Sequence, residues 1–383
     1  MPDATLLKQT PLHAWHAAHG GRLVDFAGWS MPVQYGSIVN EHHAARRSCG
    51  VFDISHMGRL RVSGPGAAAY LDGLVTRRVD NMKPGQIRYG LVCREDGGVL
   101  DDVLVYQGAD FGVGEGGVSH SDSHSTFGVV CNAGNRDKMV AWMTKRLPSG
   151  VMFEDFTLST AMMAVQGPEA MTIAAALCDI DVMPLGYYRG QAAHVMGAPA
   201  YVSRTGYTGE DGLEIVCRAD ATQAIWAALV EAAEAVGGGA VGLAARDTLR
   251  LEAGMPLYGH ELSETIRPDD AGLGFSINLK DRDFVGRDAL VALNDPAKPR
   301  QVRVGLELEG RRAAREGSRV LLDGDVVGTV TSGSFSPTFQ HPLAMAFVDV
   351  AASSLETMLQ VDVRGTSLPA RVVSLPFYTR PKG

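Results

Sequence analysis

The sequence predicts an α+β region followed by a C-terminal antiparallel β-domain that we expect to close as a barrel. In the first part, segments that begin at Val62 and Val165 share one pattern, in which an apolar, strand-like run meets Gly-Pro and continues into a helical stretch. This repetition indicates an internally duplicated strand–helix unit. From about Gln301 the pattern changes to short alternating apolar runs joined by tight turns such as Asp323-Gly324, which is typical of antiparallel strands.

The boundary between the two parts is expected in the segment 294–299, where two prolines and polar residues favour neither helix nor strand. We therefore assign residues 1–290 to the α+β region and residues 300–380 to the β-domain. Within the first region the clearest helix ends before Gly237 and has Asp220 as its candidate N-cap. One apolar stripe at helical spacing supports it: Ile225, Trp226, Leu229, Ala233 and Val236.

The composition excludes several classes of function. The chain has 383 residues, and its 35 Lys plus Arg against 43 Asp plus Glu give a net charge of −8, without the clustered basic runs that nucleic-acid binding requires. No stretch approaches roughly 20 apolar residues, so no membrane span is expected. The five cysteines are widely spaced without Cys-x-x-Cys, which favours a reducing setting over a zinc ribbon or a disulfide framework. Because the first residues show no targeting signal, we expect a bacterial cytoplasmic protein, or a mitochondrial one only if a leader was removed.

Two glycine- and histidine-rich patterns are weak candidate sites. The run 112–117 spells the dinucleotide-binding fingerprint, but no helix follows whose N-terminus could hold a pyrophosphate. His120, Asp122 and His124 could bind a metal ion, although a Ser/Gly/His hairpin loop is the favoured interpretation.

The segment 97–106 is more informative, because two acids, Asp101 and Asp102, interrupt an apolar run. A half-buried carboxylate must be paired or hydrogen-bonded to offset its desolvation. If the run is a strand, period-two alternation sends the two acids to opposite faces, so only one can serve a given pocket. Reflection across the 94–98 turn places Tyr89 roughly opposite Asp102 or the residue after it, so that a phenol and a carboxylate can meet. The alternative is that one acid is solvated and the other caps a neighbouring backbone group.

Two further clusters hold polar side chains. Between residues 203 and 214 three glycines allow tight backbone geometry, and Glu214 enters an apolar strand, where its carboxylate can accept two parallel hydrogen bonds from an amidine-like heterocycle. In the following helical segment, Arg246 and Arg250 share one face with Asp247 one position around. Taken alone, this second cluster favours an intrahelical ladder of ion pairs.

Eight motifs run in order along nearly the whole chain. They are Val24–Trp29, Met31–Tyr35, Phe52–Gly58, Gly97–Tyr106, Ser203–Glu214, Gly242–Gly259, Asp283–Arg287 and Ser332–Pro337. Together they resemble the aminomethyltransferase of the glycine cleavage system, the T-protein family, in content and separation. The resemblance implies a folate-binding region of two α+β lobes and a C-terminal β-barrel domain, in a three-lobed arrangement around a central channel.

The resemblance also implies a reaction and its participants. The donor is an aminomethyl group on the lipoyl-lysine arm of a carrier, the H-protein, and tetrahydrofolate accepts the one-carbon unit. The products are 5,10-methylenetetrahydrofolate, ammonia and the dihydrolipoyl carrier, with no metal or flavin involved.

By correspondence of positions, Asp102 resembles the family's key carboxylate near the folate N5 and N10. There it holds the pterin and stabilises iminium character, and proton acceptance from N10 stays open. Glu214 resembles the acceptor for the amino and ring N–H groups of the pterin. The other positions implied around the folate are Tyr89, Tyr207 and Arg246, with Asn132 and the His56-Met57 turn lining the channel.

Two alternatives stay open, because this fold is reused for different functions. One is a folate-dependent demethylase that acts on another methyl or aminomethyl donor. The other is a non-catalytic folate-binding protein that assists iron–sulfur cluster assembly, although no cysteine here is followed by Tyr as in the Lys-Gly-Cys-Tyr motif of those relatives. Since folates are polyanions and H-proteins tend to be acidic, we expect basic residues to gather around Arg246, at the channel and its mouth.

Overall fold

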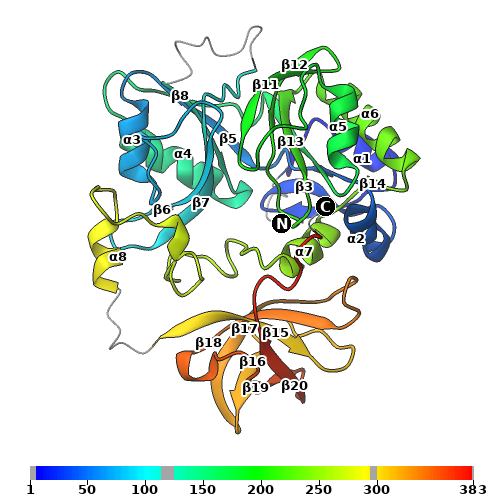
Figure 1. The fold of residues 1–383 in the computed structure, drawn as a ribbon, viewed down its shortest axis with the longest axis vertical. Helices are drawn as coiled ribbons and strands as arrows, with labels where there is room; N and C mark the ends of the chain where they lie inside the picture. The colour runs from blue at the N-terminus through cyan, green and yellow to red at the C-terminus, as the bar shows by residue number, and fades with distance from the viewer. Residues whose placement is uncertain (1–5, 114–124, 294–299, 382–383) are drawn as a thin grey trace.

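Three parts make up the molecule in the computed structural model, which describes residues 6–113, 125–293 and 300–381. Figure 1 shows two α+β lobes side by side and a β-barrel below them. Across the described residues, no helix is long and apolar enough to cross a membrane.

The first lobe is built on a five-stranded sheet covered on one face by two helices. In spatial order its strands are β6 (Ile87–Cys93), β7 (Val99–Gln107), β8 (Thr126–Cys131), β5 (Gly58–Ser63) and β9 (Met152–Asp155). Its helices are α3 (Ala67–Leu74) and α4 (Arg136–Lys145), and the one-turn 3-10 helix η1 (Ala133–Asn135) precedes α4. Side chains such as Leu71 of α3, Met139 of α4 and Val105 of β7 bury the face between helices and sheet.

The second lobe repeats this plan with a six-stranded sheet. In spatial order its strands are β11 (Gly190–Val195), β12 (Ala198–Ser203), β13 (Gly212–Arg218), β10 (Thr160–Gln166), β4 (Gly50–Asp53) and β14 (Gly239–Ala240). Its helices are α5 (Ala170–Leu177) and α6 (Thr222–Ala235). The order β11-β12-β13-β10-β4 matches β6-β7-β8-β5-β9 of the first lobe. The duplicated unit predicted at the two Gly-Pro segments is therefore present, and it extends over a whole lobe.

The glycine of each Gly-Pro pair is required by its surroundings. Gly64 and Gly167 have φ angles of +112° and +134°, in the region that favours glycine. A Cβ atom at either position would also lie 2.4 Å from a backbone carbonyl oxygen, that of Gly150 or of Ser48. Each glycine thus lets the chain leave its strand and turn into the helix that covers it.

The helix α6 differs in detail from the prediction. It begins at Thr222, and Asp220 does not cap it because its carboxylate pairs with Arg218 at 2.8 Å. Val236 lies beyond the helix and is exposed. The helix ends as predicted before Gly237, which has a φ of +81°.

Smaller elements connect the lobes. They are the three-stranded sheet β1 (Lys8–Gln9), β3 (Trp29–Gln34) and β2 (Arg22–Phe26), the helices α1 (His13–Ala18), α2 (Ile38–Arg47), α7 (Leu243–Glu252) and α8 (Arg287–Leu293), and the 3-10 helix η2 (Gly274–Ser276). The lobes also touch directly, because Gln86 forms an antiparallel bridge with Arg189. These two residues precede β6 and β11 and so hold equivalent positions in the two repeats.

The C-terminal part is a closed antiparallel barrel, as predicted. Its strands in spatial order are β15 (Gln301–Leu308), β18 (Pro342–Asp349), β17 (Asp325–Phe335), β16 (Arg319–Leu322), β19 (Met358–Val363) and β20 (Thr366–Val373), with the 3-10 helix η3 (Val350–Ala352) after β18. Asp323 and Gly324 both have positive φ and form the predicted turn between β16 and β17. The segment 294–299, where we place the domain boundary, lies outside the described residues.

Candidate active site

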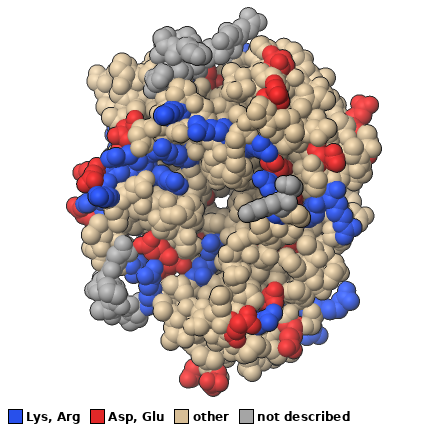
Figure 2. Space-filling model, viewed as in Figure 1, with Lys and Arg blue, Asp and Glu red and all other residues tan. Residues whose placement is uncertain are grey.

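A cavity of about 830 Å³ lies where the three parts meet. Figure 2 shows the molecule hollowed at the centre of the viewed face. Its lining combines residues from both lobes, from α7 and from residues 331–333 of strand β17 in the barrel. All six site residues expected from the sequence lie in this lining: Tyr89, Asp102, Asn132, Tyr207, Glu214 and Arg246.

The two acids of β7 point to opposite faces of the strand, as the alternation predicts. Asp102 faces the cavity, whereas Asp101 is fully buried behind it. Asp101 accepts hydrogen bonds from the Asn132 backbone N–H at 2.9 Å and from Asn135 Nδ2 at 2.6 Å. The alternative prediction, in which one acid is solvated and the other caps a backbone group, is therefore half right. Asp101 accepts a hydrogen bond from a backbone N–H, but Asp102 lines the cavity and does not point into open solvent.

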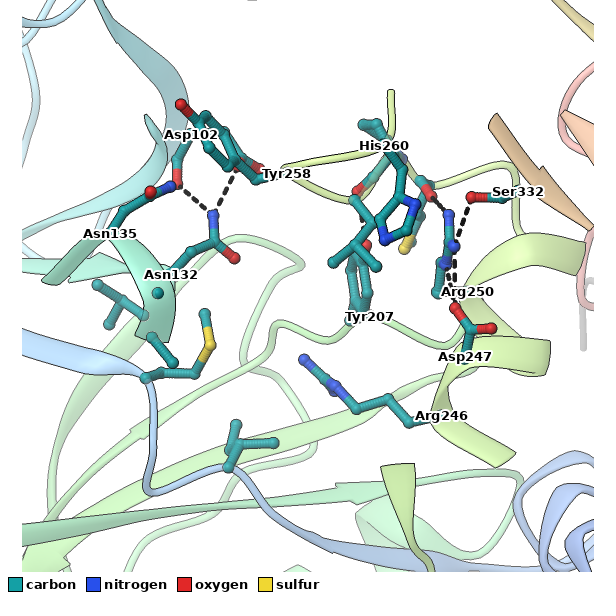
Figure 3. Close-up of a pocket in the computed structure, with 18 of the residues that line it drawn as sticks. Asp102, Asn132, Asn135, Tyr207, Arg246, Asp247, Arg250, Tyr258, His260 and Ser332 are labelled. Atoms are coloured by element: carbon teal, nitrogen blue, oxygen red, sulfur yellow. Dashed lines mark hydrogen bonds and ion pairs between the residues drawn. The ribbon is translucent and has the colours of Figure 1, made fainter. Parts of the chain in front are cut away.

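Asn132 connects the two carboxylates. Its Nδ2 donates to Asp101 Oδ1 at 2.8 Å and to Asp102 Oδ1 at 2.7 Å, and Figure 3 shows Asn132, Asn135 and Asp102 together on one wall of the cavity. Burial raises the pKa of both carboxyls, and the neighbouring charge of Asp102 raises the pKa of Asp101 further, whereas the amide donors act in the opposite direction. The pair consequently holds a proton more readily than isolated aspartates do.

Tyr89 reaches Asp102 from the neighbouring strand. Its hydroxyl donates to Asp102 Oδ2 at 3.1 Å. The expected register is wrong, however: Tyr89 lies opposite Leu104, and Asp102 lies opposite Leu91. A bulge after Val92 shifts the pairing, so the phenol and the carboxylate meet diagonally.

The second lobe and α7 form the facing wall. Glu214 on β13 is buried and accepts a hydrogen bond from Thr205 Oγ1 at 2.5 Å. The Tyr207 hydroxyl donates to the Pro256 carbonyl at 2.5 Å, and the Arg246 guanidinium lies 4.8 Å from the centre of the Tyr207 ring. Burial raises the pKa of Glu214, and the charge of Arg246 acts against that rise.

Arg246 differs from its neighbour Arg250, although both stand on α7. Arg250 pairs with Asp247 at 2.9 Å and with Glu261 at 3.0 Å, and it donates to Ser332 of the barrel at 2.8 Å. No carboxylate of the described residues lies within ion-pair distance of Arg246, and Figure 3 shows its side chain reaching into the space between the two walls. The predicted ion pairs thus describe the contacts of Arg250. The guanidinium of Arg246 is available to bind a ligand in the cavity.

His56 and Met57 lie in the cavity wall, as expected. His56 is 2% exposed, and its Nδ1 atom has no hydrogen-bond partner among the described residues. Burial lowers the pKa of this imidazole to about 3, so it is neutral near pH 7.

Sequence reasoning missed several lining residues. They are Tyr188, Tyr258, His260, Phe275, Arg303 and Arg315. Most belong to irregular segments, where no periodicity marks the inward direction. For Phe275 a signal was available, because an aromatic residue stands inside the glycine-containing run 272–276, and its ring stacks on Tyr89 with centroids 6.0 Å apart.

The two weak candidates fall largely on residues that the structure does not describe. Residues 114–124, which include His120, Asp122, His124 and most of the dinucleotide fingerprint, lie outside the described part of the chain. In that described part, no group of three or more His, Cys, Asp or Glu side chains is placed to hold a metal ion.

The arrangement offers two kinds of chemistry on facing walls. The acids and Tyr89 of the first lobe suit a reacting centre that develops positive charge. The Glu214 carboxylate and the Arg246 guanidinium suit a flat polar heterocycle with both donor and acceptor edges.

Comparison with known proteins agrees with this site. The GCVT N-terminal domain matches residues 12–281, and the glycine cleavage T-protein C-terminal barrel domain matches residues 301–379. The chain belongs to the glycine cleavage T-protein family. T-protein relatives named aminomethyltransferase are 45% identical in Streptomyces coelicolor, over 99% of this chain and 100% of the relative, and 44% identical in Cutibacterium acnes, over 98% and 100%. The crystal structure of glycine cleavage system aminomethyltransferase T from Bartonella henselae matches with a TM-score of 0.86 and 32% identity, over 97% of this chain and 98% of that one.

This T-protein is therefore an aminomethyltransferase, which confirms the resemblance and contradicts the non-catalytic alternative. Its two lobes are alike in topology but not in chemistry. By strand register, Asp102 of the first lobe corresponds to Pro199 in the second, and Glu214 of the second corresponds to Gly128 in the first. Each lobe of the T-protein thus supplies one acid to the cavity, Asp102 or Glu214, and the equivalent position of the other lobe has no acid.

Proposed function

We propose that the chain transfers the one-carbon unit of an aminomethyl group, held as a thioaminal on the lipoyl arm of H-protein, to tetrahydrofolate. The products are 5,10-methylenetetrahydrofolate, ammonia and the dihydrolipoyl carrier. The observation that carries the proposal is the placement of Asp102 and of the Glu214–Arg246 pair on facing walls of one cavity, in a chain of this family. A reacting centre and a heterocycle can occupy such a cavity together.

The step balances without a metal or an oxidant. The methylene carbon forms bonds to N5 and N10 of the folate, while its bonds to the carrier sulfur and to the amino nitrogen break. The two protons lost from N5 and N10 go to the sulfur and to the departing ammonia.

Each wall has a separate task in this step. Glu214 accepts hydrogen bonds from the amino and ring N–H groups of the pterin, and Arg246 with Tyr207 holds the ring system. Asp102, positioned by Asn132 and Tyr89, stabilises the cationic iminium character of the methylene as ammonia leaves.

The test is a direct assay of the full chain with tetrahydrofolate and an aminomethylated lipoyl carrier. We expect ammonia and 5,10-methylenetetrahydrofolate in equal amounts. Asp102→Asn should lower kcat roughly 100-fold or more, because the charge that stabilises the iminium is removed, while the Kd for tetrahydrofolate stays within a few-fold. Absence of ammonia with a competent carrier would reject the proposed reaction. Full activity in Asp102→Asn would reject the proposed role of Asp102 in that reaction.

A matched control removes the same charge elsewhere. Asp362 lies on β19 of the barrel and pairs with Arg319 at 2.8 Å, and neither residue lines the cavity. Asp362→Asn should leave kcat unchanged.

A further inference from the structure

One polar side chain in the cavity wall has no task in the proposed step. His56 is buried and lines the cavity, and neither of its ring nitrogens forms a hydrogen bond within the described part of the chain. A buried polar atom without a partner is uncommon in a folded protein, because nothing offsets its desolvation. A neutral imidazole has one N–H donor and one acceptor nitrogen, so this ring can still bond to a ligand.

The backbone on both sides of His56 is held in place. The Ser55 N–H donates to Asp53 Oδ1 at 2.9 Å. The Arg59 guanidinium, which is fully buried, donates to the Ser55 carbonyl at 3.0 Å and to the Met57 carbonyl at 2.6 Å. The turn that carries the imidazole is therefore fixed before any ligand binds.

The side chains around the imidazole do not satisfy its N–H. The Asp53 carboxylate is already engaged, because Thr10 Oγ1 donates to its Oδ2 at 2.7 Å and His16 Nε2 lies 2.9 Å from the same atom. The Phe26 ring packs edge-on against His56 with centroids 5.4 Å apart, and it has no conventional acceptor atom. The protein thus leaves the imidazole N–H to the contents of the cavity.

Positive charge does not accumulate in the main cavity. Its lining carries four arginines and four acids: Arg246, Arg250, Arg303, Arg315, Asp102, Glu214, Asp247 and Glu316. The gathering of basic residues that we expected around Arg246 is therefore absent from this lining. Basic residues line a second pocket at the β6 edge of the first lobe instead: Arg77, Arg78, Arg88 and Lys280.

The surroundings keep His56 neutral. Burial lowers the pKa of the imidazole to about 3, and the charges of Arg246 and Arg59 act in the same direction, against the charge of Asp53. A second cation beside Arg246 would be repelled and would lose its hydration. A neutral donor avoids both costs.

Arg246 connects His56 to the proposed position of the heterocycle. Its charge acts on the pKa of His56 and on that of Glu214, so both groups lie near the guanidinium. In a pterin, the amino group and the ring N–H that Glu214 would accept are followed around the ring by the carbonyl oxygen at C4. This oxygen can accept two hydrogen bonds, and a guanidinium and an imidazole N–H can donate them. The Tyr207 hydroxyl is not available, because it donates to the Pro256 carbonyl.

We propose that His56 is a specificity-determining residue whose N–H donates, together with Arg246, to the carbonyl oxygen at C4 of the pterin. The inference rests on the proposed function and adds a residue to the recognition of its acceptor. The site then distinguishes a heterocycle with an oxygen at this position from one with a weaker acceptor.

The experiment measures the Kd for tetrahydrofolate by titration calorimetry, and kcat at saturating donor, on full-length variants. His56→Phe keeps a ring against Phe26 and removes both nitrogens, so the Kd should rise roughly tenfold while kcat stays near the wild-type value. His56→Gln keeps an N–H donor and should hold the Kd within about threefold of the wild type. The control is His19→Phe, because His19 is exposed, stacks on Trp15 with centroids 4.0 Å apart and does not line the cavity. Its Kd should equal that of the wild type.

A change in the ligand tests the same contact from the other side. The 4-thioxo analogue of tetrahydrofolate keeps the ring N–H and replaces the oxygen at C4 by sulfur, a weaker acceptor. The wild type should bind tetrahydrofolate about tenfold more tightly than the analogue, and His56→Phe should reduce this preference to about threefold, because one of two donors is lost. If His56→Phe does not fold, NMR of the wild type labelled with 15N-histidine replaces it. The ring N–H signal that is absent from His56→Gln should move when tetrahydrofolate is added.

The outcomes separate this inference from the proposed function. Failure of the wild type to bind tetrahydrofolate would reject the proposed function itself. An unchanged Kd in His56→Phe, an undiminished preference for oxygen over sulfur, or an unmoved N–H signal would overturn the role of His56 alone. Equal rises of Kd in His56→Phe and His56→Gln would also overturn it, since they would indicate packing and not hydrogen bonding. So would a lower kcat with an unchanged Kd, because the imidazole would then act on the aminomethyl donor.

Discussion

At the scale of single residues, the carboxamide of Asn132 determines how the two acids of β7 share charge. It donates to both carboxylates, at 2.8 Å and 2.7 Å, and its backbone N–H adds a further bond to Asp101. These donors favour the ionised acids, against the burial that raises both pKa values. The pKa of Asp102, the acid that faces the cavity, therefore depends on Asn132, which lies outside strand β7.

Asn132→Ala should move the acid limb of the pH profile of kcat/KM to higher pH. The pKa of Asp102 is already raised by burial, so activity is present above that pKa and is lost as the pH falls through it. Loss of the Asn132 donor removes stabilisation of the ionised form, which raises the pKa and shifts the limb upward. Asn135→Ala is the matched control, because Asn135 donates to Asp101 only, and its shift should be smaller. An unchanged acid limb in Asn132→Ala would contradict this role.

Arg246→Lys should weaken tetrahydrofolate binding by about tenfold, measured as Kd. The planar guanidinium lies over the Tyr207 ring, and an ammonium cannot stack in the same way or present the same fork of donors. Arg204→Lys is a suitable comparison, since Arg204 pairs with Asp211 outside the cavity lining. Equal Kd values for both variants would show that Arg246 acts by charge alone or not at all.

At the scale of elements, Arg46 ties α2 to α7 and to the loop before β13. Its guanidinium lies 3.0 Å from Glu252 and 2.9 Å from Glu210, with all three side chains buried. Arg46→Gln would remove the cation that the two buried carboxylates share and leave Glu252 with His42, 3.3 Å away, so the free energy of unfolding in urea at pH 7 should fall by about 3 kcal/mol. A change below about 0.5 kcal/mol would mean that the two carboxylates find other partners.

The same cluster predicts the pH dependence of stability. Burial alone would raise the pKa of Glu252, but the hydrogen bond and charge of His42 and the charge of Arg46 hold it at about 2, below the ordinary value of 4.5. The stabilisation is therefore complete above about pH 4.5 and is lost as the pH falls toward 2. Arg46→Gln should show a smaller loss of unfolding free energy than the wild type over this range. A steeper loss in the variant would contradict the assignment.

Elements with a strong local signal were predictable from the sequence, and long-range geometry was not. Alternation along β7 correctly separated Asp101 from Asp102, because side-chain direction in a strand depends only on the strand. The register of Tyr89 was wrong, because the bulge after Val92 depends on how the hairpin packs. Ser332 lines the cavity because of where the barrel packs against the lobes, and Phe275 because of where η2 lies. Neither position follows from a periodic pattern in the sequence.

At the scale of the whole molecule, the C-terminal segment returns from the barrel to the lobes, and Figure 1 shows it ending beside α7. The Tyr378 N–H donates to the Glu252 carbonyl at 2.7 Å, and the Arg46 guanidinium lies 3.9 Å from the centre of its ring. Arg380 then pairs with Asp211 of the second lobe at 3.1 Å. Together with the contact of Arg250 to Ser332, this segment holds strand β17 of the barrel against the cavity.

Tyr378→Ala should therefore affect stability and ligand binding together. Loss of a desolvated cation–π contact should lower the free energy of unfolding by about 2 kcal/mol. Because residues 331–333 of strand β17 line the cavity, a barrel held less firmly should also raise the Kd for tetrahydrofolate. Tyr378→Phe keeps the ring over Arg46 and loses only the hydrogen bond of the hydroxyl to Glu210, so it should lose less stability than the alanine variant and keep the wild-type Kd. If the alanine variant loses stability but binds tetrahydrofolate normally, the C-terminal segment holds the barrel without shaping the cavity, and Arg250 alone positions residues 331–333 of β17.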